Sequence, residues 1–178
     1  MTWATRPSLP GGHEVTASEV DAILDQIEDA TSPPFWKLDA TATSVSTATD
    51  ARLTFSTNVG SSGVTVTSLR TIAIIKPGRY EVRFTCRWNA GGTGGAEIYG
   101  NIRRYNSGAV GQEGCANGGG SHSGGGGDTC AKGSMICAAG DLLEAWVYQA
   151  SGGSKTPAGS PFGFPGGTMF EGYWVGDA

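Results

Sequence analysis

The alternation of apolar and polar residues along residues 80–88 is the strongest structural pattern in the chain. Charged or hydroxyl side chains occupy every second position, and apolar side chains fill the positions between them. A period of two is typical of an antiparallel strand with one face in the core and the other in solvent. We therefore predict a half-buried strand whose inward residues are Tyr80, Val82, Phe84, Cys86 and Trp88.

Shorter apolar and β-branched runs lie on both sides of this strand. Turn signals separate them, such as Lys76-Pro77-Gly78-Arg79, in which proline presets one backbone angle and glycine permits a positive one. Short strands at regular spacing are typical of a β-sandwich or barrel. The sequence thus predicts an all-β domain over residues 35–178, with about eight strands, at 52–56, 64–67, 69–75, 80–88, 96–106, 129–137, 142–149 and 170–175.

Residues 1–34 follow a different pattern and form a separate predicted unit. A Pro- and Gly-rich arm comes first, and Thr16 and Glu19 then make a T-x-x-E capping box that starts a helix. Pro33 and Pro34 end the helix. The helix carries one apolar stripe, which would either pack on the β domain or dock onto another protein: Val20, Ile23, Leu24 and Ile27.

Residues 108–127 are dominated by glycine, which occupies ten of the twenty positions. Such a segment has few side chains for a core, and ordering it costs much backbone entropy. We therefore expect a Gly-rich loop inserted in the β domain and held by a neighbouring copy of the chain.

Charge is unevenly distributed along the chain, whose formal net charge is −4. Residues 1–50 carry eight acids against two bases, a net charge of −6, whereas the remainder stands at +2. No basic stripe with exposed aromatic residues marks a nucleic-acid surface. No apolar run approaches the roughly 18 residues that a membrane span needs. We accordingly expect neither a nucleic-acid nor a membrane partner.

The residues suited to chemistry do not form a recognisable catalytic set. His13 and His122 lie in Gly-rich surroundings, and the carboxylates of Glu113 and Asp128 flank or lie in the Gly-rich segment, a poor support for precise catalytic geometry. The four cysteines contain no C-x-x-C pair, so a structural zinc site is not expected. We therefore expect that the protein is not an enzyme and that it binds neither a metal ion nor a cofactor.

Two of the cysteines could form a disulfide. Cys115 and Cys130 bracket much of the Gly-rich segment, and a bridge between them would remove chain entropy from it. A reducing assembly compartment would oppose that bridge. Cys86, on the inward face of its strand, is instead expected to be a buried small apolar residue.

Four segments, in chain order, resemble the complement/tumour-necrosis-factor (TNF) type of jelly roll: KPGRY at 76–80, IYGN at 98–101, AGDLLEAWV at 139–147 and FEGYWV at 170–175. The resemblance implies an antiparallel jelly-roll sandwich. Members of that family assemble as compact trimers whose closing strands lie near the threefold axis. The resemblance of this chain to the family therefore implies a homotrimer with Phe170, Tyr173 and Trp174 at its interface.

The N-terminal region resembles the start of many tailed-bacteriophage virion proteins, in which a similar stretch precedes an exposed β domain. The matching residues are WATRP at 3–7, Gly12 and VTASEV at 15–20. Asp21-Ala22 departs from the asparagine often found there. This resemblance implies a virion anchor formed by Trp3 together with the stripe of Val20, Ile23, Leu24 and Ile27.

Together the two resemblances imply a non-enzymatic structural protein on the virion surface, assembled in the host cytoplasm. As a trimeric capsid decoration protein it would bind the major capsid protein through its N-terminal arm. One alternative is a tail-tip or fibre protein that binds tail proteins and a host surface glycan. Another is a free-standing sugar- or protein-binding jelly roll.

Overall fold

The computed structural model describes residues 16–41, 44–88, 96–106, 112–122, 128–158 and 167–178. The chain divides into two compact units, Met1–Pro33 and Pro34–Ala178. The division lies one residue from the boundary that the sequence pattern suggests.

The first unit contains the helix α1 (Ala17–Thr31). Its start has the predicted reciprocal cap, because the Thr16 backbone N–H donates to the Glu19 carboxylate over 2.8 Å. In return, the Glu19 N–H donates to the Thr16 hydroxyl over 3.3 Å. Both bonds satisfy amides that have no partner within the helix itself. The capping box is therefore confirmed.

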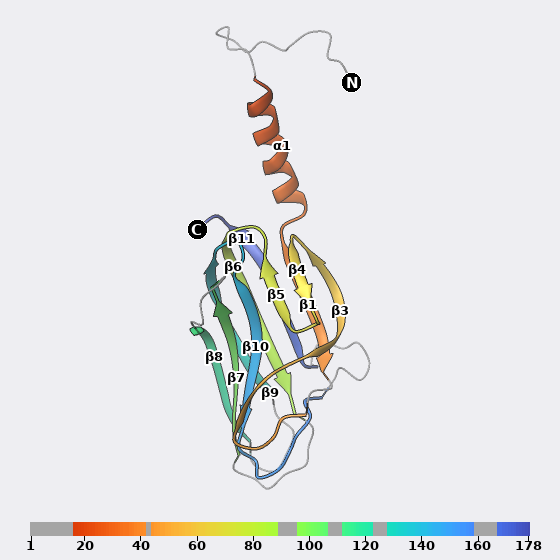
Figure 1. The fold of residues 1–178 in the computed structure, drawn as a ribbon, viewed down its shortest axis with the longest axis vertical. Helices are drawn as coiled ribbons and strands as arrows, with labels where there is room; N and C mark the ends of the chain where they lie inside the picture. Colours follow the sequence, from red (N-terminus) through yellow and green to blue (C-terminus); the bar gives the residue numbers. More distant parts are fainter. Residues whose placement is uncertain (1–15, 42–43, 89–95, 107–111, 123–127, 159–166) are drawn as a thin grey trace. The chain divides into compact units, whose positions relative to one another are not determined.

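The second unit is a sandwich of two antiparallel sheets, whose strands run side by side along its length (Figure 1). The five-stranded sheet has the order β3 (Phe55–Ser62), β1 (Phe35–Thr41), β11 (Met169–Gly176), β6 (Gly78–Arg87) and β9 (Asp128–Cys137). The six-stranded sheet consists of β4 (Val64–Thr67), β5 (Thr71–Ile74), β10 (Leu142–Gln149), β7 (Ala96–Tyr105) and β8 (Gln112–His122), with β2 (Thr49–Arg52) also paired to β10.

The core lies between the two sheets, and the alternation that predicts β6 is confirmed. All five apolar residues of that pattern are buried, with no more than 3% of their surface exposed. Cys86 is among them and packs as a small apolar side chain in the core cluster. The sequence pattern thus identifies both the strand and the direction in which its side chains point.

Gly172 shows how closely the core is packed beneath the closing strand. A Cβ atom added at this position would lie 2.2 Å from one carbon of the Trp36 indole and 2.3 Å from another. The Trp36 ring is itself 1% exposed and meets Phe170 edge-on, with ring centroids 5.6 Å apart. Glycine is needed here because the indole fills the space of a side chain.

Two predictions about the strands are wrong. The predicted strand at residues 52–56 is not one strand, because β2 ends at Arg52 and β3 begins at Phe55. The sequence pattern did not predict strand β1. Trp36 and Leu38 alternate with Lys37 and Asp39 there, but over too few residues to give a clear period of two.

The Gly-rich segment is the second correction. Residues 112–122 form β8, which pairs with β7 of the same chain, so a neighbouring copy is not needed to order this strand. Ladder hydrogen bonds come from the backbone, and a strand can therefore form with few side chains if its neighbour supplies a paired edge.

Candidate functional site

The apolar stripe of α1 is exposed. Val20, Ile23, Leu24 and Ile27 have 44%, 54%, 55% and 53% of their surfaces accessible. Trp3, the other expected anchor residue, lies outside the described residues. Four large aliphatic side chains, each about half exposed along one side of a helix, form a surface suited to an apolar contact.

The three residues of the closing strand β11 that were expected at a trimer interface do not share one environment. Phe170 is fully buried in the core against Trp36 and Phe55, so its assignment to an interface is corrected. Trp174 is half-buried, and the ammonium group of Lys76 lies 3.9 Å from the centroid of its ring. Only Tyr173, which is 55% exposed, faces outward.

Tyr173 has an aromatic neighbour that the sequence did not single out. Phe35 on β1 stands directly opposite Tyr173 in the strand register and is 41% exposed. Directly opposed residues in an antiparallel pair point to the same face. The outward face of the five-stranded sheet therefore carries a paired, exposed aromatic patch, Phe35–Tyr173.

The possible bridge between Cys115 and Cys130 is not formed in this structure, in which Cys130 is a free cysteine. Cys130 carries an exposed thiol, and the side chain of Cys115 lies outside the described residues. Pairing under oxidising conditions stays a prediction. Within the described part of the chain, no group of three or more His, Cys, Asp or Glu side chains could hold a metal ion.

The side chains of His13, His122, Glu113 and Asp128 also lie outside the described residues. None of the helical residues that the structure describes forms an apolar segment long enough to span a bilayer.

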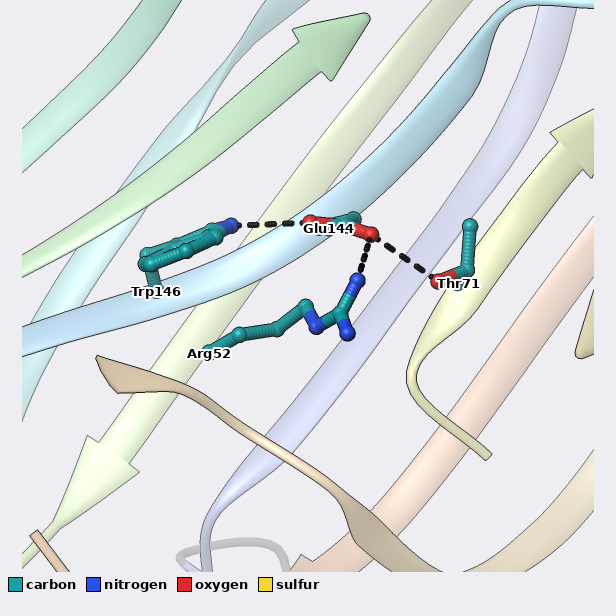
Figure 2. Close-up of polar contacts among 4 residues, drawn as sticks. All are labelled: Arg52, Thr71, Glu144 and Trp146. Carbon is teal, nitrogen blue, oxygen red and sulfur yellow. Dashed lines mark hydrogen bonds and ion pairs between the residues drawn. The ribbon is translucent and has the colours of Figure 1, made fainter. Parts of the chain in front are cut away.

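The outward face of the six-stranded sheet has a polar cluster that the sequence did not predict (Figure 2). Its centre is Glu144 on β10, whose side chain is only 6% exposed. One carboxylate oxygen accepts bonds from the Arg52 guanidinium over 2.6 Å and from the Thr71 hydroxyl over 3.0 Å. The other accepts a bond from the indole N–H of Trp146 over 3.0 Å.

These donors reach Glu144 from three strands, β2, β5 and β10. A buried carboxylate is costly unless hydrogen bonds and an opposite charge compensate for the lost water. Here the compensation is supplied by cross-strand neighbours, since Thr71 stands opposite Glu144 and Arg52 stands opposite Trp146. The cluster therefore fixes the Trp146 side chain in one orientation.

Arg103 on β7 extends this arrangement toward the next strand. Its guanidinium lies 4.2 Å from the centroid of the Trp146 ring and makes a 2.7 Å ion pair with Asp50. The Arg103 side chain is 11% exposed, whereas that of Asp50 is 52% exposed. One basic and one acidic group thus stand side by side at the surface, and their charges offset each other.

Beside this pair the sheet is hollowed by an open pocket of about 420 Å³. Aromatic side chains form much of its wall: Tyr99 and Tyr148 stand opposite each other in the register, with ring centroids 6.1 Å apart. Asp50, Asn101, Arg103 and Trp146 also line it. The pocket falls within the range of roughly 300–1,000 Å³ typical of small-molecule sites.

Two polar atoms of pocket residues are buried without a hydrogen-bond partner among the described residues, namely Oδ1 of Asn101 and Nε of Arg103. A buried polar atom left unsatisfied costs about 1–3 kcal/mol. One is an acceptor and the other a donor. Two residues of the pocket wall therefore have hydrogen-bonding capacity, one as acceptor and one as donor, that the described residues do not use.

Sequence reasoning missed this pocket, although a signal was present. The residues occupy alternate positions, Tyr99, Asn101 and Arg103 on one strand and Glu144, Trp146 and Tyr148 on another. Aromatic and charged residues that share the outward face of a strand suggest binding rather than core packing. Only the register shows that the two sets are neighbours, because β7 and β10 are about 40 residues apart in the chain.

Comparison with known proteins shows the fold. No family model and no curated protein matches the chain. Among solved structures, the Eiger TNF from S. frugiperda is similar with a TM-score of 0.63 and 15% identity, over 82% of this chain and 95% of that one. Murine APRIL at pH 8.5 is similar with a TM-score of 0.60 and 12% identity, over 80% of this chain and 98% of that one. The β domain is a TNF-like jelly roll.

Proposed function

We propose that this protein is a non-enzymatic structural component of a phage particle, a homotrimeric decoration protein on the outside of the capsid. In this proposal the TNF-like domain forms the exposed head. The N-terminal arm and α1 attach the head to the major capsid protein. The likeness of residues 3–20 to the start of tailed-phage virion proteins supports the virion setting.

The observation that carries the proposal is the exposed stripe of α1, in which each of the four aliphatic side chains is 44–55% accessible. Fully burying one such side chain is worth roughly 1.5–3 kcal/mol, so the stripe could supply a substantial part of a binding energy. Acidic residues on the rest of the helix, among them Asp21, Asp25 and Glu28, would complement basic surfaces between capsid subunits.

Self-association is assigned to the five-stranded sheet. Aromatic residues are enriched at the centres of protein interfaces, and the Phe35–Tyr173 patch is accessible on the outward face of that sheet. A threefold assembly uses two different patches of each subunit and closes on itself. The TNF-like fold supports the trimer as the expected closed form.

Attachment is tested with purified particles and two variants of the helix. Ile23→Asp would place a charge in the apolar contact and lower binding by roughly a hundredfold, equivalent to about 2.8 kcal/mol. Asp25→Asn, on the opposite side of the helix, should change particle occupancy little. Occupancy is measured by co-sedimentation and the melting temperature by calorimetry.

Lost occupancy with unchanged melting of the Ile23→Asp variant supports attachment through the stripe. Lowered melting with wild-type occupancy would show that the stripe packs within the protein, and it would reject the stripe as an anchor.

Trimerisation is tested by light scattering of the full chain. The wild-type protein should have three times the chain mass of 18.2 kDa. The double variant Phe35→Ser, Tyr173→Ser should shift toward the monomer, whereas Tyr99→Ser on the other sheet should not. A wild-type monomer at micromolar concentration contradicts the trimer.

A receptor-binding protein at the tail tip is the second candidate, and the pocket on the six-stranded sheet is the observation that favours it. The number of copies per particle separates the two roles, since a shell coat needs hundreds and a tail tip only a few. Absence from purified particles would instead favour a free-standing sugar- or protein-binding jelly roll.

A further inference from the structure

We propose that the pocket lined by Tyr99, Asn101, Arg103 and Tyr148 is a binding site for an uncharged saccharide, with room for one or two sugar units. This inference concerns a site and a ligand class that the structural role does not require. It also does not depend on where the protein is attached.

The wall of the pocket has the composition that a sugar ring needs. A pyranose has an apolar face of C–H groups and a rim of hydroxyls. Its C–H groups can rest on the electron-rich face of an aromatic ring, while the hydroxyls bond to polar side chains. The rings of Tyr99 and Tyr148 supply aromatic surface, and Asp50, Asn101 and Arg103 supply the polar groups.

The charges around the pocket favour an uncharged ligand. Arg103 and Asp50 are paired with each other over 2.7 Å. Glu144, beside them, already accepts bonds from the Arg52 guanidinium and two further donors. An anion would meet Asp50, and a cation would meet the guanidinium of Arg103. Neither sign of charge is left over for a ligand to neutralise.

The unsatisfied atoms point to a hydroxyl in particular. Oδ1 of Asn101 lacks a donor and Nε of Arg103 lacks an acceptor within the described structure. Both atoms are buried, so a ligand reaches them only after a small movement of either side chain. A hydroxyl group both donates and accepts, so neighbouring hydroxyls of one sugar can then serve both atoms. A carboxylate or phosphate only accepts, and it would leave Asn101 without a donor.

The site is held in place before a ligand arrives. Trp146 is fixed between its bond to Glu144 and the guanidinium of Arg103, and Arg103 is in turn held by Asp50. Residues whose orientation is set by such contacts lose little freedom on binding. An open pocket of this kind is expected to bind a single sugar weakly, with a Kd in the millimolar range, about −4 kcal/mol.

The pocket also stays accessible when the protein associates through its other sheet. It lies on the outward face of β7 and β10, whereas the Phe35–Tyr173 patch lies on the outward face of the five-stranded sheet. In a trimer the same weak site would be present three times. Simultaneous binding to a multivalent surface could then raise the overall avidity by orders of magnitude.

The test is a titration of the full-length protein with methyl glycosides of glucose, galactose, mannose and N-acetylglucosamine, followed by NMR and by tryptophan fluorescence. At least one should perturb the Trp146 indole signal with a millimolar Kd. Methyl glucuronide, which differs from methyl glucoside by a carboxylate, tests the preference for an uncharged ligand.

Two matched variants assign the binding to the pocket. Tyr99→Ala should weaken binding by tenfold or more, and Tyr99→Phe should retain most of it because the ring is kept. Tyr173→Ala is the control, since Tyr173 is similarly exposed, at 55% against 47% for Tyr99, but lies on the other sheet. Melting temperatures of all variants check that they are folded.

Three results would overturn the proposal. One is the absence of any response to the four neutral glycosides at about 100 mM, well above the expected Kd. Another is an equal loss of binding in the Tyr99→Ala and Tyr173→Ala proteins. The third is tenfold tighter binding of the glucuronide than of the glucoside.

Discussion

The two outward faces of the β-sandwich differ in the burial and the contacts of their charged and aromatic side chains. On the five-stranded sheet the pair Arg83–Glu171 is loose, with 3.8 Å between its atoms and 52% and 29% of the side chains exposed. On the six-stranded sheet the Glu144 side chain is 6% exposed and accepts bonds from three donors. Both faces carry accessible aromatic rings, Tyr173 on one and Tyr99 on the other, whereas Trp146 on the six-stranded face is held by Glu144 and Arg103.

The difference arises from the neighbours of each strand. Strand β2 lies along β10 and brings Arg52 and Asp50 onto the six-stranded face, where they meet Glu144 and Arg103. On the five-stranded face the pair Arg83–Glu171 is loose and more exposed. Residues alternate between inward and outward positions in both sheets. On the six-stranded face β2 adds side chains and a pocket forms, whereas the five-stranded face carries the aromatic patch Phe35–Tyr173.

The largest expected effect is on the core that both faces share. Gly172→Ala should destabilise the protein by about 3 kcal/mol, because the new Cβ would overlap the buried Trp36 indole. Gly153→Ala is the matched control, since nothing lies within 4 Å of a Cβ at that position, and its effect should be within about 0.5 kcal/mol. Urea unfolding measures both. Equal stabilities of the two variants would mean that the indole can move aside.

The second prediction contrasts one carboxylate from each face. Glu144→Gln should cost about 2 kcal/mol, because it leaves the Arg52 guanidinium without its buried partner. Glu171→Gln should change stability by about 0.5 kcal/mol or less, as expected for an exposed pair. Unfolding in urea at neutral pH gives both values. Similar costs would show that the two faces do not differ in the way described.

The third prediction concerns the pH dependence of stability, which Tyr80 in the core beneath the five-stranded sheet should cause. Burial, together with the nearby Cys137, raises the pKa of Tyr80 to about 12 from its usual 10.0. Its stabilising contribution is therefore complete below pH 10 and is lost as the pH rises toward 12, since only the unfolded chain releases the proton there. The loss should be roughly 2 kcal/mol.

Denaturant unfolding between pH 9 and pH 12 measures this loss, with Tyr80→Phe as the control. The variant lacks the ionisable hydroxyl and also its 2.7 Å bond to the Lys76 carbonyl, so it starts less stable. The difference in free energy of unfolding between the wild-type protein and the Tyr80→Phe variant should become smaller as the pH rises. Parallel curves would exclude the raised pKa.

The smallest effect compares the two cation–aromatic contacts. Lys76→Gln removes a contact with Trp174 near the surface and should cost about 0.5 kcal/mol. Arg103→Gln removes the contact with Trp146 and also the ion pair with Asp50, so its cost should be at least twice as large. Thermal unfolding of the two variants ranks them, and the opposite ranking would contradict the rigid network on the six-stranded face.

Local patterns were sufficient for several elements of the fold. The helix cap at Thr16 and Glu19 involves residues three apart, and the inward set of β6 follows from a period of two within one segment. Both depend on interactions between near neighbours in the chain. The jelly roll was implied by the resemblance of four ordered segments to the TNF family, and the structural comparison shows that fold.

Pairing between distant segments decided what local patterns could not. Strand β8 is Gly-rich and exists because β7 offers it a paired edge. Phe170 and Tyr173 lie three residues apart on one strand, yet the former is buried and the latter is 55% exposed. Alternation alone left open which of them faces the core, since both positions are aromatic.

The amino-acid sequence by itself determined the all-β class, the separate helical unit, the helix cap and the inward face of β6, since each depends on residues close together in the chain. Only the tertiary structure decided the Phe35–Tyr173 patch, the burial of Glu144 and the pocket beside Arg103. These features join residues from strands far apart in sequence. The physical reason is that the register between strands places side chains together, and that register is fixed by the packing of the whole sandwich.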